Sequence, residues 1–327
     1  MNKVSLKDIA ESLGVSKALV SLVLNNKGDD RGINKETQQR VKNKAKELNY
    51  SPNQYARGLR TGKSNTLGLI VPDISNVFYG NLCKAIEMKA SDLGYDLIIS
   101  NTYEDPEREL NLIDKLINKS IDGLILASSQ ETSVKLKVLQ DNKFPFVLID
   151  RVFPEFNIDS VSVSNIEGAK QAVNFLKNEG CNQIACLTIS PVYISSIADR
   201  IKGYIDGVND PENTCLIQIP HDNIDSGIEK ALRQIEDKKF DAVFCVNNNL
   251  TKSLLKAINK NNIKTNYRII SFDDLEVFDF ANPKVSAINQ PINKIGEKSV
   301  ELLLNRIANK EKHITQKIVL KTGIIVR

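Results

Sequence analysis

Residues 5–26 read SLKDIAESLGVSKALVSLVLNN and contain two short helical patterns separated by a glycine. The apolar residues of the first pattern recur at helical spacing and are Leu6, Ile9, Ala10 and Leu13. Ser5 and Asp8 have the spacing of a capping box, and Gly14 ends the pattern. Ser16 can cap the second pattern, whose inward stripe is Val20, Val23 and Leu24. The stretch therefore predicts a helix-turn-helix.

A third helix is predicted after Asn34, which with Thr37 can cap it. Its apolar stripe is Val41, Ala45 and Leu48, and Tyr50 and Pro52 end it. Residues 1–63 carry 13 Lys and Arg against 6 Asp and Glu, a net charge of +7, whereas the other 264 residues carry 31 and 34. A basic excess confined to this small region indicates a polyanionic partner, with DNA favoured over the alternative of a basic three-helix bundle that binds protein.

The second predicted helix is expected to enter the major groove of DNA. Lys17 can donate to guanine, and Ala18 can touch a thymine methyl group. Phosphate contacts, which position the protein without reading sequence, suit Ser16, Ser21 and Asn25. The predicted DNA-contacting residues of this region are Ser5, Ser16, Lys17, Ala18, Leu19, Ser21, Leu22 and Asn25.

Residues 56–64, ARGLRTGKS, are close to a phosphate-binding loop. Such a loop needs four residues between its glycines, but Gly58 and Gly62 enclose only three. The stretch also follows polar residues, whereas a phosphate-binding loop follows a buried strand and opens a helix. We therefore reject the nucleotide-binding interpretation, which leaves a flexible linker as one reading of this segment.

Composition restricts the class of the protein. A chain of 327 residues, 41% hydrophobic and 26% charged, is typical of a soluble globular protein with two or three domains. It shows no long apolar run and no secretory signal, so we expect no membrane partner. Five cysteines without a C-x-x-C pair suit a reducing cytoplasm, and the two histidines lack metal-ligand spacing.

From residue 66 onward, apolar strands alternate with helical stretches, as in GLIVPD, YDLIISNT, DGLILA, PFVLID, QIACLT, CLIQIP, AVFCVN and RIISFDD. This alternation predicts parallel sheets with right-handed crossovers. There are too many strands for one compact sheet, so we predict an α/β core of two Rossmann-like lobes. The chain is expected to cross between the lobes near 160–164, near 287–292 and again near its C-terminus.

Polar residues follow several of these strands, where ligands bind in open parallel sheets. They are Asp73 and Asn76, Asp150 and Arg151, Asn247 and Asn248, and Asp273 and Asp274. With Phe78 or Tyr79 available to stack, they suit a polyhydroxylated ligand, although strand ends are also polar because they meet solvent. Arg200 could hold sugar hydroxyls or a phosphate, or could form a surface ion pair with Asp199 or Asp206.

Two other classes of protein share the α/β pattern. An enzyme needs a catalytic constellation, and the sequence shows neither a G-x-G-x-x-G after a strand nor a nucleophile paired with histidine. A solute-binding protein for transport would need a signal peptide and has no use for a basic helix-turn-helix. We therefore predict a binding protein without catalytic residues, cofactor or metal.

The sequence resembles the lactose-repressor (LacI) family of bacterial transcription regulators. The resemblance is carried by residues 5–26 and by ELNYSPNQYARGLRTGKSNTLGLIVPDISNVFY (47–79), and it extends to the end of the chain. Two features depart from the family pattern. Leu22 stands where an arginine is usual, and the loop KGDDRGIN (27–34) is longer than usual.

The resemblance implies a helix-turn-helix domain at 1–50, a hinge at 51–65 and a two-lobed, periplasmic-binding-protein-like core at 66–327. The N-lobe would comprise about 66–160 and 292–320, and the C-lobe about 165–288 and 321–327. In the family the hinge becomes a helix on DNA and presses a leucine, here Leu59, into the minor groove between flanking cations. The implied contacts of the hinge are Asn53, Tyr55, Ala56, Leu59 and Arg60.

The family's effector contacts correspond here to Phe78, Tyr79, Asp150, Arg200, Asn247 and Asp273, to which we add Asp73. The implied protein is a homodimeric regulator, with repression the family's usual outcome. It would bind a palindromic double-stranded DNA operator under the control of a sugar-like effector, in the bacterial cytoplasm and associated with the nucleoid. The chain ends at LKTGIIVR without a heptad tail, which favours a dimer over a tetramer. The operator sequence, the effector and the sign of its action stay open.

Overall fold

The computed structural model describes residues 4–50, 63–190, 192–309 and 314–327. The chain divides into two compact units, Met1–Ser64 and Asn65–Arg327. We describe each unit by itself.

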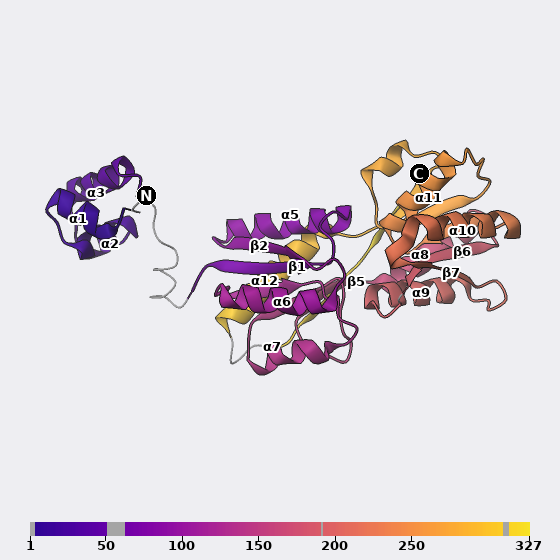
Figure 1. Cartoon of the computed structure of the whole chain (residues 1–327), viewed down its shortest axis with the longest axis horizontal. Coiled ribbons are helices and arrows are strands. Elements are labelled where there is room, and N and C mark those ends of the chain that lie inside the picture. Colours follow the sequence, from indigo (N-terminus) through magenta and orange to yellow (C-terminus); the bar gives the residue numbers. More distant parts are fainter. Residues whose placement is uncertain (1–3, 51–62, 191, 310–313) are drawn as a thin grey trace. The chain divides into compact units, whose positions relative to one another are not determined.

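The first unit is a bundle of short helices (Figure 1). Its elements are α1 (Leu6–Leu13), α2 (Lys17–Leu24), the 3-10 turn η1 (Asp29–Arg31) and α3 (Lys35–Glu47). The buried side chains of its core are Ile9, Ala10, Val20, Val23, Val41 and Ala45. These belong to the three predicted apolar stripes, so the expected helix-turn-helix and third helix are present.

The predicted caps of these helices are also present. Ser5 and Asp8 form a capping box at α1, and Gly14 ends that helix with a left-handed φ of 65°. The side chain of Ser16 accepts a hydrogen bond from the Leu19 amide, and that of Asn34 accepts one from the Thr37 amide. Caps of this kind satisfy helix amides that have no partner within the helix.

The loop at 27–34 has its own local order. Asp29 accepts hydrogen bonds from Lys35 at 2.8 Å and from the Gln38 amide at 2.8 Å. Gln38 also donates to the Ile33 carbonyl, and its side chain lies so close to Gly28 that a Cβ there would be 2.5 Å away. Residues 27–34 therefore fold into a compact turn against the start of α3.

The second unit contains two sheets of six strands each. The first has the order β11-β5-β4-β3-β1-β2 and is parallel throughout. Its strands are β1 (Thr66–Val71), β2 (Asp96–Asn101), β3 (Gly123–Leu126), β4 (Phe146–Ile149), β5 (Ser160–Val163) and β11 (Lys317–Leu320). The accompanying helices are α5 (Val77–Asp92), α6 (Pro106–Asn118), η2 (Ser133–Leu136), α7 (Lys137–Asp141) and α12 (Ile292–Ala308).

The second sheet has the order β12-β10-β9-β8-β6-β7, and only β12 is antiparallel to its neighbour. Its strands are β6 (Ile184–Ser190), β7 (Cys215–Pro220), β8 (Ala242–Cys245), β9 (Arg268–Phe272), β10 (Val285–Asn289) and β12 (Gly323–Ile325). The accompanying helices are α8 (Asn165–Asn178), α9 (Ser195–Val208), η3 (His221–Asn223), α10 (Ile224–Lys238), α11 (Asn248–Lys260) and η4 (Glu276–Phe280).

Each sheet, with its helices, forms a lobe (Figure 1), so the predicted fold class is confirmed. The chain passes between the lobes after β5, after β10 and between β11 and β12. The N-lobe extends beyond the expected residue 160, because β5 up to Val163 pairs with β4 and β11. Similarly, β10 keeps the chain in the C-lobe up to Asn289.

The five cysteines are free thiols. Among the described residues, no helix is long and apolar enough to cross a membrane, and no group of three His, Cys, Asp or Glu could hold a metal ion.

Candidate functional site

A cavity of about 70 Å³ lies where the carboxyl ends of strands from both lobes meet. All seven predicted effector residues line it, together with Asn76, Glu104, Arg151, Ser196 and His221 among others. Asp73 follows β1, Asp150 follows β4, Asn247 follows β8 and Asp273 follows β9. Placing ligand-binding residues at strand ends is typical of open parallel sheets.

Two of these residues have an unusual backbone. Asp150 has a φ of 59° and Asp273 a φ of 73°, both in the left-handed region. Aspartate tolerates this region better than most residues, and such conformations concentrate at functional sites. The turn directs the chain away from the sheet immediately after the strand, at the edge where both carboxylates line the cavity.

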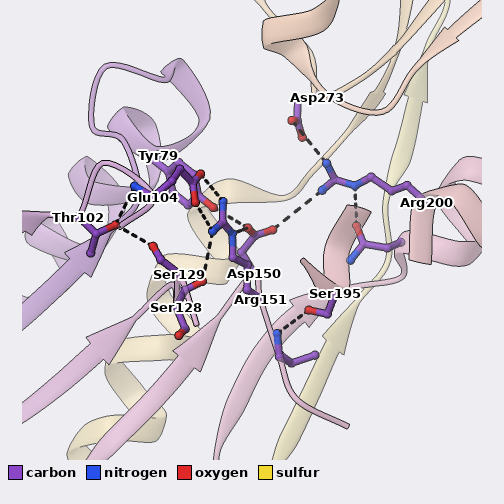
Figure 2. A network of polar contacts seen from close by, with 12 residues as sticks. Tyr79, Thr102, Glu104, Ser128, Ser129, Asp150, Arg151, Ser195, Arg200 and Asp273 are labelled. Atoms are coloured by element: carbon purple, nitrogen blue, oxygen red, sulfur yellow. Dashed lines mark hydrogen bonds and ion pairs between the residues drawn. The ribbon is translucent and has the colours of Figure 1, made fainter. Parts of the chain in front are cut away.

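Arg200 in α9 lies between these two carboxylates and is only 3% exposed (Figure 2). Its Nη2 is 3.9 Å from Asp150 Oδ1, and its Nη1 is 3.9 Å from Asp273 Oδ2. It donates hydrogen bonds of 2.9 Å to Asn165 Oδ1 and to the Val246 carbonyl. The guanidinium also lies 3.8 Å from the centre of the Phe272 ring. Arg200 is therefore a fixed, buried cation inside the cavity rather than the partner of a surface ion pair.

Each carboxylate is held by a further side chain. The hydroxyl of Tyr79 donates to Asp150 Oδ2 at 2.7 Å, and the Gln290 amide donates to Asp273 Oδ1 at 2.5 Å. Burial raises the pKa of Asp273, while Arg200 and the Gln290 hydrogen bond act in the opposite direction. Burial also raises the pKa of Tyr79 well above its usual value, so this hydroxyl stays a donor.

A second arginine lies on the N-lobe side of the cavity. Arg151 forms two hydrogen bonds of 2.6 Å to the carboxylate of Glu104, and a third of 3.2 Å to the Ser128 carbonyl. Its Nε atom is buried and has no hydrogen-bond partner in the described chain. That atom lies 3.9 Å from Asp150 Oδ2. One donor of this cavity-lining residue is therefore left without a partner among the described residues.

A buried glutamate supports the turn that holds Arg151. Glu109 of α6 is fully buried and accepts hydrogen bonds from the Ser128 hydroxyl and the Ser129 amide. The Ser129 hydroxyl in turn shares a 2.8 Å hydrogen bond with Thr102 (Figure 2). Burial raises the pKa of Glu109, and these hydrogen bonds oppose the increase.

Two direct hydrogen bonds join the lobes beside the cavity. The Val152 amide donates to Ser195 Oγ at 2.9 Å, and the Asn248 side-chain amide donates to Asn76 Oδ1 at 3.0 Å. These contacts hold the two lobes together at the edge of the cavity.

The sequence identified the strand-end residues but missed several partners. Glu104 follows β2 and Gln290 follows β10, so the rule used for the other strand ends could have found both. Asn165 begins α8, and no local pattern in the sequence connects it with Arg200, 35 residues later.

The predicted DNA-contacting residues of the head lie on or beside α1 and α2. Lys17, Ala18 and Asn25 are exposed, whereas Leu19, Ser21 and Leu22 are partly buried. Leu19 packs against the core of the head, and the hydroxyl of Ser5 bonds to Asp8 within the α1 cap. The exposed start of α2 thus presents Ser16, Lys17 and Ala18 together. The hinge residues Asn53, Tyr55, Ala56, Leu59 and Arg60 lie outside the described residues.

A basic helix-turn-helix head followed by a two-lobed core with a polar cleft defines a class, the ligand-responsive DNA-binding regulators. Residues 5–53 match the family described as bacterial regulatory proteins, lacI family. Residues 64–322 match the family described as periplasmic binding proteins and sugar binding domain of LacI family. The chain belongs to the LacI family of bacterial transcriptional regulators. The family resemblance is thereby confirmed, and with it the assignment to DNA-binding regulators rather than enzymes.

Relatives match along nearly the whole chain. It is 31% identical over 333 residues to the HTH-type transcriptional regulator DegA of Bacillus subtilis, covering 99% of this chain and 97% of that protein. It is also 31% identical over 327 residues to the ribose operon repressor of Halalkalibacterium halodurans, covering 99% and 96%.

Solved structures share the fold. The lac repressor dimer bound to operator and the anti-inducer ONPF has a TM-score of 0.86 at 21% identity, covering 100% of this chain and 98% of that chain. A LacI family regulator from Enterococcus faecalis with bound ribose has a TM-score of 0.71 at 26% identity, covering 80% and 97%.

Proposed function

We propose that this regulator binds a near-palindromic DNA operator as a homodimer, and that a sugar-like effector in the interlobe cavity changes its affinity for DNA. The convergence of seven predicted residues from both lobes on one cavity is the observation that carries the effector part of the proposal. The match of residues 5–53 to the bacterial regulatory proteins of the lacI family supports the part of the proposal that concerns DNA binding. Relatives that are named as a ribose operon repressor, or that were solved with bound ribose, support a sugar as the ligand.

We assign one function to each of three successive segments of the chain. Residues 1–50 would read the major groove, residues 51–65 would act as the hinge, and residues 66–327 would bind effector and form the dimer. In the head, Lys17 and Ala18 are the proposed base contacts, because both are exposed at the start of α2. Asn25 stays a proposed phosphate contact, since its side-chain amide has two N–H groups and the hydrogen bond to the Ser21 carbonyl at 2.6 Å uses one of them.

The proposed dimer places one head in each half-site, so that the symmetry of the operator mirrors that of the protein. In the hinge, Leu59 would enter the central minor groove, with Arg60 beside it and Asn53, Tyr55 and Ala56 completing the contact. A regulator that acts in this way works in the cytoplasm, associated with the nucleoid, and repression is the proposed outcome.

Effector action would depend on the geometry between the lobes. A ligand that favours a wider cavity would strain the Val152–Ser195 and Asn76–Asn248 contacts, which join the lobes beside it. A ligand that binds one lobe arrangement better than another shifts the population toward it. The hinge is attached directly before β1 of the N-lobe, so a change between lobes can alter the spacing of two hinges in a dimer.

A thermal-shift screen with sugars, followed by a DNA-binding assay with each hit, tests this proposal. A ligand that binds only the folded protein raises its melting temperature. We expect a sugar to raise the melting temperature and to change the affinity for a selected DNA duplex. A sugar that binds the cavity with no effect on DNA affinity would contradict control by the effector.

A further inference from the structure

We propose that the interlobe cavity accepts a sugar or amino sugar and excludes sugar phosphates and sugar acids. This inference rests on the proposed effector function and narrows its ligand to molecules without an anionic group. The charges around the cavity and the vacant hydrogen-bonding positions support it independently.

The side chains that line the cavity carry more negative than positive charge. Its carboxylates are Asp73, Glu104, Asp150 and Asp273, and its permanent cations are Arg151 and Arg200. The bidentate hydrogen bonds between Glu104 and Arg151 pair those two charges with one another. Arg200 is then shared by two buried carboxylates, while the carboxylate of Asp73 accepts hydrogen bonds from the amide and hydroxyl of Ser75.

An anionic ligand would therefore approach four carboxylates that face only two permanent cations, Arg151 and Arg200. Like charges in a site of low dielectric repel strongly, and the desolvation of a phosphate or carboxylate adds to that cost. A neutral sugar avoids this repulsion, and the ammonium of an amino sugar compensates part of the excess. The electrostatic field thus favours ligands whose charge is zero or positive.

Hydrogen bonding leads to the same class of ligand. The two gaps of 3.9 Å between Arg200 and the carboxylates of Asp150 and Asp273 are too long for direct hydrogen bonds. A hydroxyl group beside either pair can bridge it, donating to the carboxylate and accepting from the guanidinium. A fully ionised phosphate can accept but cannot donate, so its oxygens would leave the carboxylates facing anions.

The Nε atom of Arg151, which has no hydrogen-bond partner among the described residues, marks a third place where a ligand hydroxyl could bind. This residue is 8% exposed and lines the cavity, so its remaining donor requires an oxygen from a ligand or solvent. A sugar hydroxyl can supply that oxygen and still donate its own proton to Asp150, whose Oδ2 lies 3.9 Å from Nε. Each vacant position therefore suits a group that both donates and accepts.

Matched sugar series test the inference. The full chain is titrated by calorimetry with glucose, galactose and ribose, with glucosamine and galactosamine, and with the corresponding 6- or 5-phosphates and with gluconate, galacturonate and ribonate. We expect at least one neutral or amino sugar to bind, and its phosphate and acid counterparts to bind at least about tenfold more weakly. A phosphate or acid that binds as tightly as its neutral parent overturns the inference.

If no member of any charge class binds, the sugar-effector proposal is overturned, and this inference with it. If sugars bind irrespective of charge, only the inference about charge is overturned. The two results therefore distinguish failure of the proposed function from failure of this refinement.

A pair of variants tests the physical cause. Asp273→Asn removes one carboxylate from the cavity and keeps a residue that tolerates the φ of 73°. It should reduce the preference for the neutral sugar over its phosphate. Asp114→Asn removes the same charge from an exposed position on α6 and should leave the preference unchanged. An unchanged preference in Asp273→Asn overturns the role of the paired carboxylates, as does an equal change in both variants.

Discussion

Single residues of the cleft work through partners that hold them in place. Arg200 reaches both lobes because Asn165 and the Val246 carbonyl fix its guanidinium, and because Phe272 supports it from one side. Replacing it with alanine would leave two buried carboxylates without their shared cation, which is far more costly than losing an exposed charge. The identity of this residue therefore matters to stability as well as to binding.

The sequence predicts such residues only in part. Asp150 and Asp273 follow apolar strands, so their place at the cleft can be read directly from the strand pattern. Their pairing with Tyr79 and Gln290 cannot be read in this way, because 71 and 17 residues separate the partners in the chain. Contacts between distant residues depend on the packing of the lobes, which local patterns do not specify.

Glu109 provides a prediction at the residue scale. Burial raises the pKa of Glu109 in the folded protein, so its stabilising effect is complete at low pH and is lost as the pH rises through that raised pKa. Glutamine can keep the contacts with Ser128 and Ser129 and cannot ionise. Glu109→Gln should therefore become more stable relative to the native chain as the pH rises above the usual pKa of a glutamate.

Urea unfolding at several pH values measures this difference. Glu107→Gln, on the exposed side of the same helix, is the matched control and should show no such trend. A difference between Glu109→Gln and the native chain that stays constant over the whole pH range would contradict the prediction.

At the scale of elements, close helix packing in the C-lobe depends on glycine. Helices α8 and α9 approach so closely at Gly203 that a Cβ there would lie 2.2 Å from the Ile166 carbonyl oxygen. That atom belongs to the backbone, so no change of rotamer can relieve the clash. The alternation of strands and helical stretches indicated helices in this part of the chain. It did not indicate that the crossing of α8 and α9 needs a glycine, because that need arises from their three-dimensional packing.

Gly203→Ala should therefore destabilise the chain by about 2 kcal/mol or more, even though alanine favours helices. Gly80→Ala in α5 is the matched control, because the nearest atom to its added Cβ, the Ile74 carbonyl oxygen, is at an ordinary 3.4 Å. The control should be neutral or gain up to about 1 kcal/mol. Denaturant unfolding of both variants measures their free energies of unfolding. Equal values for Gly203→Ala and Gly80→Ala would contradict the prediction, because they would mean that α8 and α9 can move apart at little cost.

The boundaries of helices and strands could also be predicted from the sequence only in part. The apolar runs located the strands, yet the N-lobe continues to Val163 because SVSV, with its small polar residues, still pairs on both sides. In the head, the caps at Ser5, Ser16 and Asn34 were predictable from spacing alone. The turn at Asp29 was not, since it depends on Gln38 in the following helix.

At the scale of the whole molecule, the chain divides into two compact units, and we propose that the first binds DNA and the second binds the ligand. The sequence indicates such a division, because the excess of positive charge lies in residues 1–63 and strand-helix alternation begins at residue 66. In this proposal the hinge links the two functions, and its leucine is a wedge in the minor groove.

Leu59→Ala should weaken binding to a selected operator by on the order of tenfold or more, with little change on random DNA. The reason is that an apolar wedge acts only where a central base step can be kinked. Fluorescence anisotropy with both duplexes at one fixed salt concentration measures the two affinities. Equal losses on both duplexes would contradict a role for Leu59 at a kinked step.

Selection of binding sites from a random duplex pool, with the full chain at a fixed salt concentration, tests the central claim most directly. The account predicts enrichment of near-palindromic sites, with two half-sites placed about a central flexible step. A pool that shows no enriched sequence, or enriches a single site without two-fold symmetry, would contradict a dimeric operator-binding regulator.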